Sequence, residues 1–159
     1  MNVNKLEKNL DRQLYWVQAA DSKVAPLFAI NLAMLGLLAA LFKENRSWSA
    51  WEILFSVAAT LPLLLSVLTV LLVLFPRLDG PKESSIFFGG IAKQDAGRFN
   101  KRQLTLSKKD YCNDLLNQTY RNAEIANQKY GNLKQAYILT VISIPGWLCV
   151  IYALNFQTN

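Results

Sequence analysis

The sequence predicts an all-α membrane protein: three transmembrane helices with a cytoplasmic helical stalk formed by extensions of the first and third spans. Two observations predict this class. Hydrophobic residues make up 52% of the 159 positions and charged residues only 18%. The charges are also unevenly placed, because residues 24–42, 53–75 and 136–154 carry none. Each block is close to the roughly 20 residues that a helix needs to cross a hydrocarbon layer.

The distribution of Lys and Arg predicts the orientation of these spans. Residues 1–23 hold 4 of them, the connector between the first two spans holds 2, and residues 76–135 hold 11. We therefore expect the N-terminus and the long 76–135 segment to face the cytoplasm. The inside bias of a membrane protein also accounts for most of the net charge of +6.

Four segments follow from this topology. We expect a cytoplasmic N-terminal helix over 1–23 and the first two transmembrane helices, with a short outer connector, over 24–75. A cytoplasmic basic segment and a long helix follow over 76–135. The third transmembrane helix and a short outer tail occupy 136–159.

The N-terminal segment reads as a helix that runs straight into the first span. Leu6, Leu10, Leu14 and Val17 make one apolar face at helical spacing. Pro26, in the first apolar turn, allows a kink or break at the membrane surface.

The long helix before the third span begins at Ser107, which resembles the start of a capping box with Asp110. Its apolar face alternates steps of four and three, the spacing of a heptad seam. The residues expected in that seam are Cys112, Leu116, Thr119, Ala123, Ala126, Tyr130, Leu133 and Tyr137.

Asp21, directly before the first span, lies on the same helical face as Leu14 and Val17. We expect it to pair with a cation of the partner helix, and Lys129 and Lys134 are nearest in height. Such a pair would lock the two membrane-crossing helices in register. Two alternatives stay open: a ligand-responsive switch, and a solvated interface charge.

Catalytic chemistry is not indicated. The chain has no His, and its two Cys residues are far apart, so we expect no enzyme, no catalytic residue, no metal and no cofactor. Inside the spans Asn31 is the only amide, and it can bond to a neighbouring subunit or within its own chain. Pro62 and the Pro145-Gly146 pair are either hinges or ordinary kinks.

Three stretches resemble the membrane domain of Pycsar-system effectors, which are bacterial antiphage proteins. They are "WVQAADSKVA" before the first span, "SSIFFGGIAK" after the second and "YCNDLLNQTYRNAEIANQKYGNLKQAY" before the third. The resemblance implies a non-enzymatic defence effector of the bacterial inner membrane. In such a system a partner nucleotide cyclase makes a cyclic nucleotide second messenger, and the effector then disrupts the membrane.

The sequence departs from fuller members because we find no room for a separate cyclic-nucleotide-binding domain. Either the stalk and the 86–103 segment bind the signal or another chain does. A phosphate would favour the cations Lys93, Arg98, Lys101 and Arg102, and a base would stack on Phe87, Phe88 or Phe99. Contact of these cations with lipid headgroups is the competing interpretation.

The expected partners are the lipid bilayer and further copies of the chain, and we expect neither DNA nor RNA. A different class of function is a non-enzymatic membrane scaffold that recruits a cytoplasmic partner through the heptad seam.

Overall fold

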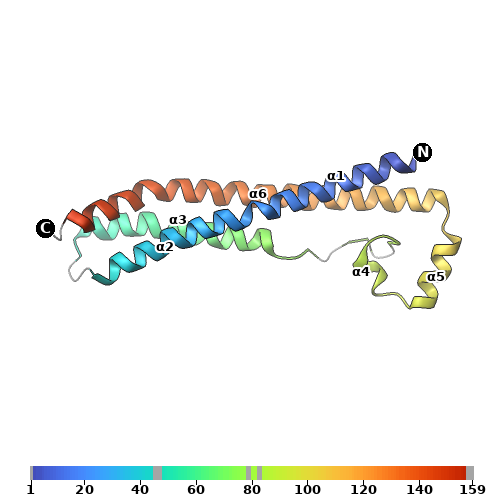
Figure 1. The fold of residues 1–159 in the computed structure, drawn as a ribbon, viewed down its shortest axis with the longest axis horizontal. Coiled ribbons are helices and arrows are strands. Elements are labelled where there is room, and N and C mark those ends of the chain that lie inside the picture. The colour runs from blue at the N-terminus through green and yellow to red at the C-terminus, as the bar shows by residue number, and fades with distance from the viewer. Residues whose placement is uncertain (1, 45–47, 78–79, 82–83, 157–159) are drawn as a thin grey trace. The chain divides into compact units, whose positions relative to one another are not determined.

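The computed structural model describes residues 2–44, 48–77, 80–81 and 84–156. Six helices account for most of these residues, and no strand occurs among them (Figure 1). The helices are α1 (Val3–Ser22), α2 (Val24–Glu44), α3 (Ala50–Leu74), α4 (Phe88–Ile91), α5 (Ala96–Thr105) and α6 (Lys108–Phe156). The expected outer connector includes residues 45–47 and the expected outer tail includes 157–159, all of which lie outside the described residues.

The chain divides into two compact units, and each is described by itself. The loop unit comprises Met1–Ala19 and Pro76–Gln128, and the span unit comprises Ala20–Phe75 and Lys129–Asn159. Helix α6 therefore contributes residues to both units.

Three helical stretches are long and apolar enough to cross a membrane, which confirms the predicted class. They lie within Val3–Lys43, Ala50–Leu74 and Lys108–Ala153. Leu61, Leu68 and Leu72 of α3 are each more than half exposed, as expected for side chains that contact lipid rather than water.

Two apolar clusters hold α2, α3 and α6 together in the span unit, and each takes residues from all three helices. The first contains Val24, Leu27, Val70, Val73, Leu133 and Ala136. The second contains Leu38, Ala59, Leu63 and Val150. The span unit is therefore a three-helix bundle.

Helices α3 and α6 approach closely at Gly146. A Cβ atom built on this glycine would lie 3.0 Å from the backbone nitrogen of Ala59 and 3.2 Å from the carbonyl oxygen of Phe55. Both are backbone atoms of α3, which cannot move aside as a side chain can. The Pro145-Gly146 pair thus marks a packing contact, and α6 continues through Pro145 without ending.

The N-terminal helix runs into the first span as expected, within one helical stretch over Val3–Lys43 that is interrupted only at Lys23. Helix α1 ends at Ser22 and α2 begins at Val24, with Lys23 forming a turn whose N–H donates to the carbonyl oxygen of Ala20 (3.2 Å). Proline has no N–H to donate to the fourth residue before it, and Pro26 therefore weakens the α-helical ladder at this turn.

Ser107 caps α6 as expected, because its Oγ accepts a hydrogen bond from the backbone N–H of Asp110 (3.1 Å). The reciprocal bond differs from a capping box. The carboxylate of Asp110 accepts from the Ser107 hydroxyl (2.6 Å).

The expected seam of α6 is right for one row of residues and one residue out for the other. The row Cys112, Ala126 and Leu133 is buried, whereas Leu116 and Tyr137 are 42% and 43% exposed. The second buried row lies one position earlier and contains Leu115, Lys129, Ala136, Ser143 and Val150. Because this row includes Lys129 and Ser143, an apolar pattern does not reveal it.

Candidate functional site

A short loop over residues 84–90, whose last three residues belong to the single turn of α4, is anchored to α6 within the loop unit. The carboxylate of Asp114 accepts hydrogen bonds from the N–H (2.6 Å) and the hydroxyl (2.7 Å) of Ser85. One turn later, the amide of Gln118 donates to the Ser84 hydroxyl (3.1 Å). Residues four apart share one face of a helix. Asp114 and Gln118 therefore form hydrogen bonds with two successive loop residues, Ser85 and Ser84.

The loop also satisfies its own backbone. Ser84 Oγ accepts from the N–H groups of Ile86 (3.1 Å) and Phe87 (2.8 Å), the local bonding that serine supplies in turns. At the far end, the Gln94 side chain donates to the carbonyl oxygen of Gly90 (3.0 Å). Ser84, Ser85 and Gly90 are buried, which makes the loop a defined structure.

The two phenylalanines of the loop have different surroundings. A Cβ atom on Gly80 or Gly89 would lie only 2.5 Å or 2.7 Å from the Phe87 ring. The Phe87 ring therefore packs against both glycines, and Phe87 is half-buried. The neighbouring Phe88 ring, 4.9 Å away between centroids, is 63% exposed. Phe88 is therefore the ring that is accessible for stacking.

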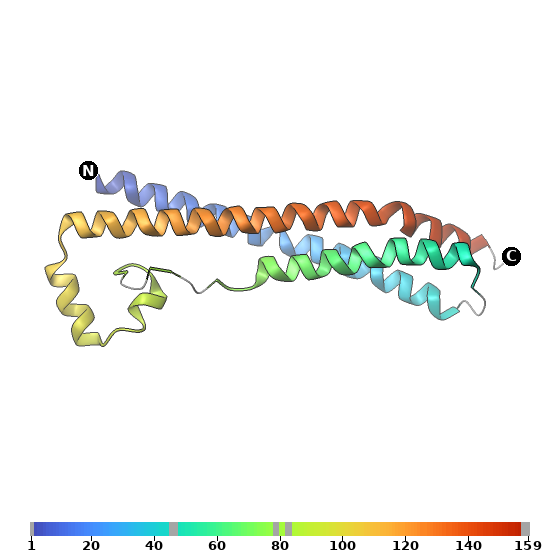
Figure 2. The ribbon, with the colours of Figure 1, turned by 180° about the vertical axis from the view of Figure 1, so that it is seen from behind.

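The basic residues follow on α5 and the turn before it. Asp95 caps α5 by accepting from the N–H groups of Gly97 (2.9 Å) and Arg98 (3.2 Å). Lys93, Arg98 and Lys101 are exposed and Arg102 is half-buried. In both views α4 and α5 lie on one side of the first part of α6, and the N-terminal part of α1 lies on the other (Figures 1 and 2).

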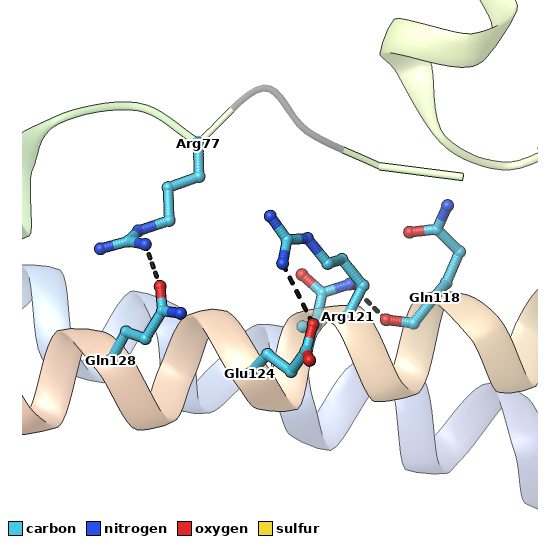
Figure 3. Close-up of polar contacts among 6 residues, drawn as sticks. Arg77, Gln118, Arg121, Glu124 and Gln128 are labelled. Carbon is cyan, nitrogen blue, oxygen red and sulfur yellow. Dashed lines mark hydrogen bonds and ion pairs between the residues drawn. The ribbon is translucent and has the colours of Figure 1, made fainter. Parts of the chain in front are cut away.

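Sequence reasoning counted Arg77 and Arg121 only as part of the positive charge of the 76–135 segment. Arg77 reaches from the segment after α3 and donates through Nη1 to the side-chain oxygen of Gln128 on α6 (Figure 3). Arg121 pairs with Glu124 at 3.0 Å on the same helix. The sequence alone does not distinguish an arginine that is solvated from one that makes a structural contact, so neither contact was predicted.

On the α1 side of the loop unit, the Tyr111 hydroxyl donates to the carboxylate of Glu7 (2.8 Å). This hydrogen bond raises the pKa of Tyr111 above its ordinary value, with burial and the negative charges of Glu7 and Asp114 as further causes.

In the span unit, the structure brings Asp21 together with Lys129. The ammonium group of Lys129 donates to Asp21 Oδ1, and the side chains are 8% and 41% exposed, respectively. Next to this pair, Lys23 Nζ lies 5.2 Å from the centroid of the Tyr130 ring. Lys134, the other cation considered from the sequence, is exposed and does not join the pair.

A closed ring of polar side chains links the three spans. Asn31 Nδ2 donates to Ser66 Oγ (2.9 Å), the hydroxyls of Ser66 and Thr140 lie 2.9 Å apart, and Thr140 donates to Asn31 Oδ1 (2.9 Å). Ser66 also contacts the Ala136 carbonyl oxygen (2.9 Å). All three side chains are buried. Of the two partners open to Asn31, the structure shows the one within its own chain.

Among the described residues, no three His, Cys, Asp or Glu side chains gather where they could hold a metal ion. An all-α fold with three helical stretches long and apolar enough to cross a membrane defines the class as a membrane protein. Comparison with known families is consistent with that class. The model of the Pycsar effector protein domain matches residues 5–155, and the chain therefore belongs to the Pycsar effector family.

A curated relative in this family is the Pycsar effector protein SaPycTM of Staphylococcus aureus. It is 21% identical over 143 residues, which cover 89% of this chain and 87% of the relative. No solved structure matches the chain. Membership confirms the resemblance read from the sequence, and it implies an antiphage defence effector. The family is not a known enzyme family.

Proposed function

We propose that this protein is an antiphage membrane effector gated by a cyclic nucleotide that a partner cyclase produces. In the signalled state it oligomerises and disrupts the integrity of the bacterial inner membrane. The N-terminus and the 76–135 segment face the cytoplasm, as the bias of Lys and Arg favours. The segments 1–23 and 76–135 then form the cytoplasmic stalk.

The observation that carries this proposal is the loop over residues 84–90 and its connection to α6. The loop and its anchors Asp114 and Gln118 lie in two of the sequence stretches that carry the family resemblance. A hydrogen-bonded loop that presents an exposed aromatic ring, followed in the chain by a basic helix, is suited to a nucleotide, because a base stacks on a ring and cations attract a phosphate.

In this proposal Phe88 stacks on the base, and Lys93, Arg98, Lys101 and Arg102 attract the phosphate. Phe87 shapes the loop that holds Phe88. The ion pair of Asp21 with Lys129 holds α1 and α6 in register or acts as the switch, and Lys134 serves it as a neighbouring cation. A ligand that binds one conformation better shifts the population toward it by its differential affinity.

The scaffold function is less well supported. Recruitment through the seam needs an accessible row of seam residues, but Cys112, Ala126 and Leu133 are buried within the chain. Leu116 and Tyr137 of the expected seam are exposed, and they leave only its other row for a partner.

Binding of the purified full chain to a panel of cyclic mononucleotides tests the proposal. We expect Phe88→Ala to weaken binding roughly fivefold or more, since base stacking contributes roughly 1–3 kcal/mol. Lys101→Gln should also weaken binding, because it removes a cation that attracts the phosphate. Tyr120→Ala and Lys109→Gln are matched controls, because Tyr120 is 69% exposed and Lys109 is exposed on α6. Equal losses in the variants and their controls would contradict this assignment of the site.

Membrane disruption is tested separately in cells that carry a membrane-potential dye. We expect depolarisation when the protein and its bound nucleotide are present together. A steady potential across the whole nucleotide panel would contradict the effector mechanism.

A further inference from the structure

Two exposed lysines, Lys23 and Lys134, lie at the end of the span unit where α1 joins it. Val24, Val73 and Leu133 pack in one apolar cluster and mark this end of the bundle. Lys23 directly precedes Val24, and Lys134 directly follows Leu133. The two ammonium groups therefore belong to the same level of the span unit.

Acidic side chains do not balance these two charges. Within the described part of the span unit, Asp21 is the only carboxylate at this end, and it already accepts from Lys129. Neither Lys23 nor Lys134 forms an ion pair with a described residue. Both are available for an anion that comes from outside the chain.

The two lysines can reach the same part of α6. Lys23 Nζ lies 5.2 Å from the centroid of the Tyr130 ring. Tyr130 and Lys134 are four residues apart, so their Cβ atoms lie about 5–6 Å apart on one helical face. Long side chains on a helix lean toward its N-terminus. This direction carries the Lys134 ammonium group toward Tyr130 and Lys23.

Gly131 leaves open space beside these lysines. It lies three residues before Lys134, and residues at this spacing are neighbours on the helix surface. Gly131 is exposed, and a Cβ atom built on it would have nothing within 4 Å. Glycine in the middle of a helix lowers stability relative to alanine, and no contact with a described residue requires it here. A molecule that approaches the backbone of α6 from outside would require it.

The same face of α6 continues as an apolar strip. Ile138 and Val141 follow Lys134 at steps of four and three, and they are 47% and 61% exposed. Tyr137 beside them is 43% exposed, and tyrosine is favoured at the boundary between lipid and water. The face thus passes from cations to apolar side chains, in the order of a phospholipid headgroup and its acyl chain.

We propose that Lys23 and Lys134 bind the phosphate of an anionic phospholipid, whose headgroup lies over Gly131 and whose acyl chain follows Ile138 and Val141. Basic groups beside membrane helices attract acidic headgroups. A free phosphate would satisfy the lysines but would leave the apolar strip without a partner. This site is separate from the proposed nucleotide site, and its ligand is present before any signal.

The test is thermal unfolding of the full chain in neutral detergent at fixed ionic strength, with increasing mole fractions of phosphatidylglycerol or of phosphatidylcholine. A ligand that binds the folded bundle and not the unfolded chain raises stability with the logarithm of its concentration. We expect Tm to rise by about 4 °C for each tenfold increase in phosphatidylglycerol above the Kd. Zwitterionic phosphatidylcholine should give a much smaller rise.

Charge variants assign that effect to the two lysines. Lys23→Gln and Lys134→Gln should each need roughly fivefold more phosphatidylglycerol for the same shift, whereas Lys23→Arg should keep the wild-type dependence. Lys43→Gln is the matched control, because Lys43 is an exposed lysine at the opposite end of α2.

Gly131→Leu separates binding from stability. Leucine favours the helix more than glycine does, so Tm without lipid should stay the same or rise. The leucine side chain fills the space for the headgroup, and the shift with phosphatidylglycerol should be lost. Gly36→Leu is the control, because Gly36 is also exposed on a helix with nothing within 4 Å of its built Cβ atom.

Several outcomes would overturn the proposal. An equal rise of Tm with phosphatidylcholine would show that the anionic headgroup is not what binds. An equal rise with inorganic phosphate alone would make the ligand a free anion. If Lys43→Gln weakens the response as much as Lys134→Gln, the attraction comes from overall charge. Should a lysine variant fail to fold, Gly131→Leu against Gly36→Leu decides the question, and equal shifts in the two would also overturn the site.

Discussion

The two units of this protein satisfy their buried polar side chains in different ways. In the span unit, Asn31, Ser66 and Thr140 bond mainly to one another, with one side chain from each span. In the loop unit, Asp114 and Gln118 of α6 bond to the backbone and hydroxyls of an irregular loop.

The surrounding solvent explains this difference. Hydrocarbon offers no water to a polar group, so spanning segments stay helical and their side chains must find partners among themselves. An irregular backbone is tolerated where side chains or water satisfy its N–H groups. The comparison predicts that substitutions in the span unit act on helix packing, whereas substitutions in the loop unit act on one segment.

The largest expected effect is in the span unit, at Gly146. Gly146→Leu forces α3 away from α6, and we expect a loss of about 3 kcal/mol in the free energy of unfolding in detergent. Gly36→Leu is the matched control, because a Cβ atom at Gly36 has nothing within 4 Å. Comparable losses at both glycines would show that the close approach is not what limits packing.

In the loop unit, Asp114→Ala removes two hydrogen bonds to Ser85. Hydrogen bonds to a carboxylate are the stronger kind, and we expect about 2 kcal/mol of local destabilisation. Hydrogen exchange of the loop amides measures it, with roughly 30-fold faster exchange at Ser85 and Phe87.

Exchange in α3 should not change in Asp114→Ala, which is what separates a local effect from a global one. The exposed Asp11→Ala on α1 is the control for charge. Faster exchange throughout α3 would contradict the independence of the two units.

The ion pair in the span unit predicts an asymmetry between its partners. Asp21→Ala leaves the buried Lys129 without its anion, and we expect a loss of about 1.5 kcal/mol. Lys129→Met leaves Asp21, whose side chain is 41% exposed and can be hydrated, so the loss should be smaller. Unfolding of both variants in detergent measures the difference, and equal losses would mean that Lys129 is not the desolvated partner.

Asn31→Leu opens the polar ring, and we expect a loss of about 1 kcal/mol, in the range of hydrogen bonds between membrane helices. Ser143→Ala is the control, since the Ser143 hydroxyl donates within its own helix to the Thr140 carbonyl oxygen (2.6 Å). If both variants unfold alike in detergent, the ring adds nothing beyond what a hydroxyl bonded to its own helix contributes.

The smallest effect depends on pH. The pKa of Tyr111 is raised in the folded protein, so its hydrogen bond to Glu7 contributes fully below about pH 10, the ordinary pKa of tyrosine. That contribution is lost as pH rises through the folded pKa. Tyr111→Phe should lower Tm slightly at pH 8, and its difference from wild type should vanish at high pH. A constant difference would contradict this linkage.

The fold could be predicted from the sequence where composition alone decides it. Runs without charge predicted three spans, and turn chemistry at Ser107 predicted the start of α6. The contact between Asp21 and Lys129 could be predicted, because the fixed rise per residue of a helix gives the position of each residue along the helix axis. The second buried row of the seam could not be predicted, because Lys129 and Ser143 are polar and are buried only with polar partners.

The loop over residues 84–90 lies beyond sequence reasoning for a different reason. Its shape depends on bonds to Asp114 and Gln118, which lie about 30 residues away in sequence. Within the loop, Gly89 lies directly against the Phe87 ring. Which of two adjacent phenylalanines is packed and which is exposed depends on that three-dimensional arrangement.

The polar ring has a consequence for how the protein is made. Asn31 and Ser66 are synthesised first, and Thr140 leaves the ribosome more than seventy residues after Ser66. Until Thr140 is present, the only hydrogen bond of this ring that can form is the one from Asn31 to Ser66. Asn31 Oδ1 then lacks the donor that Thr140 supplies. A polypeptide truncated before Ala136 would lack that donor, so the ring is completed only when the final span is present.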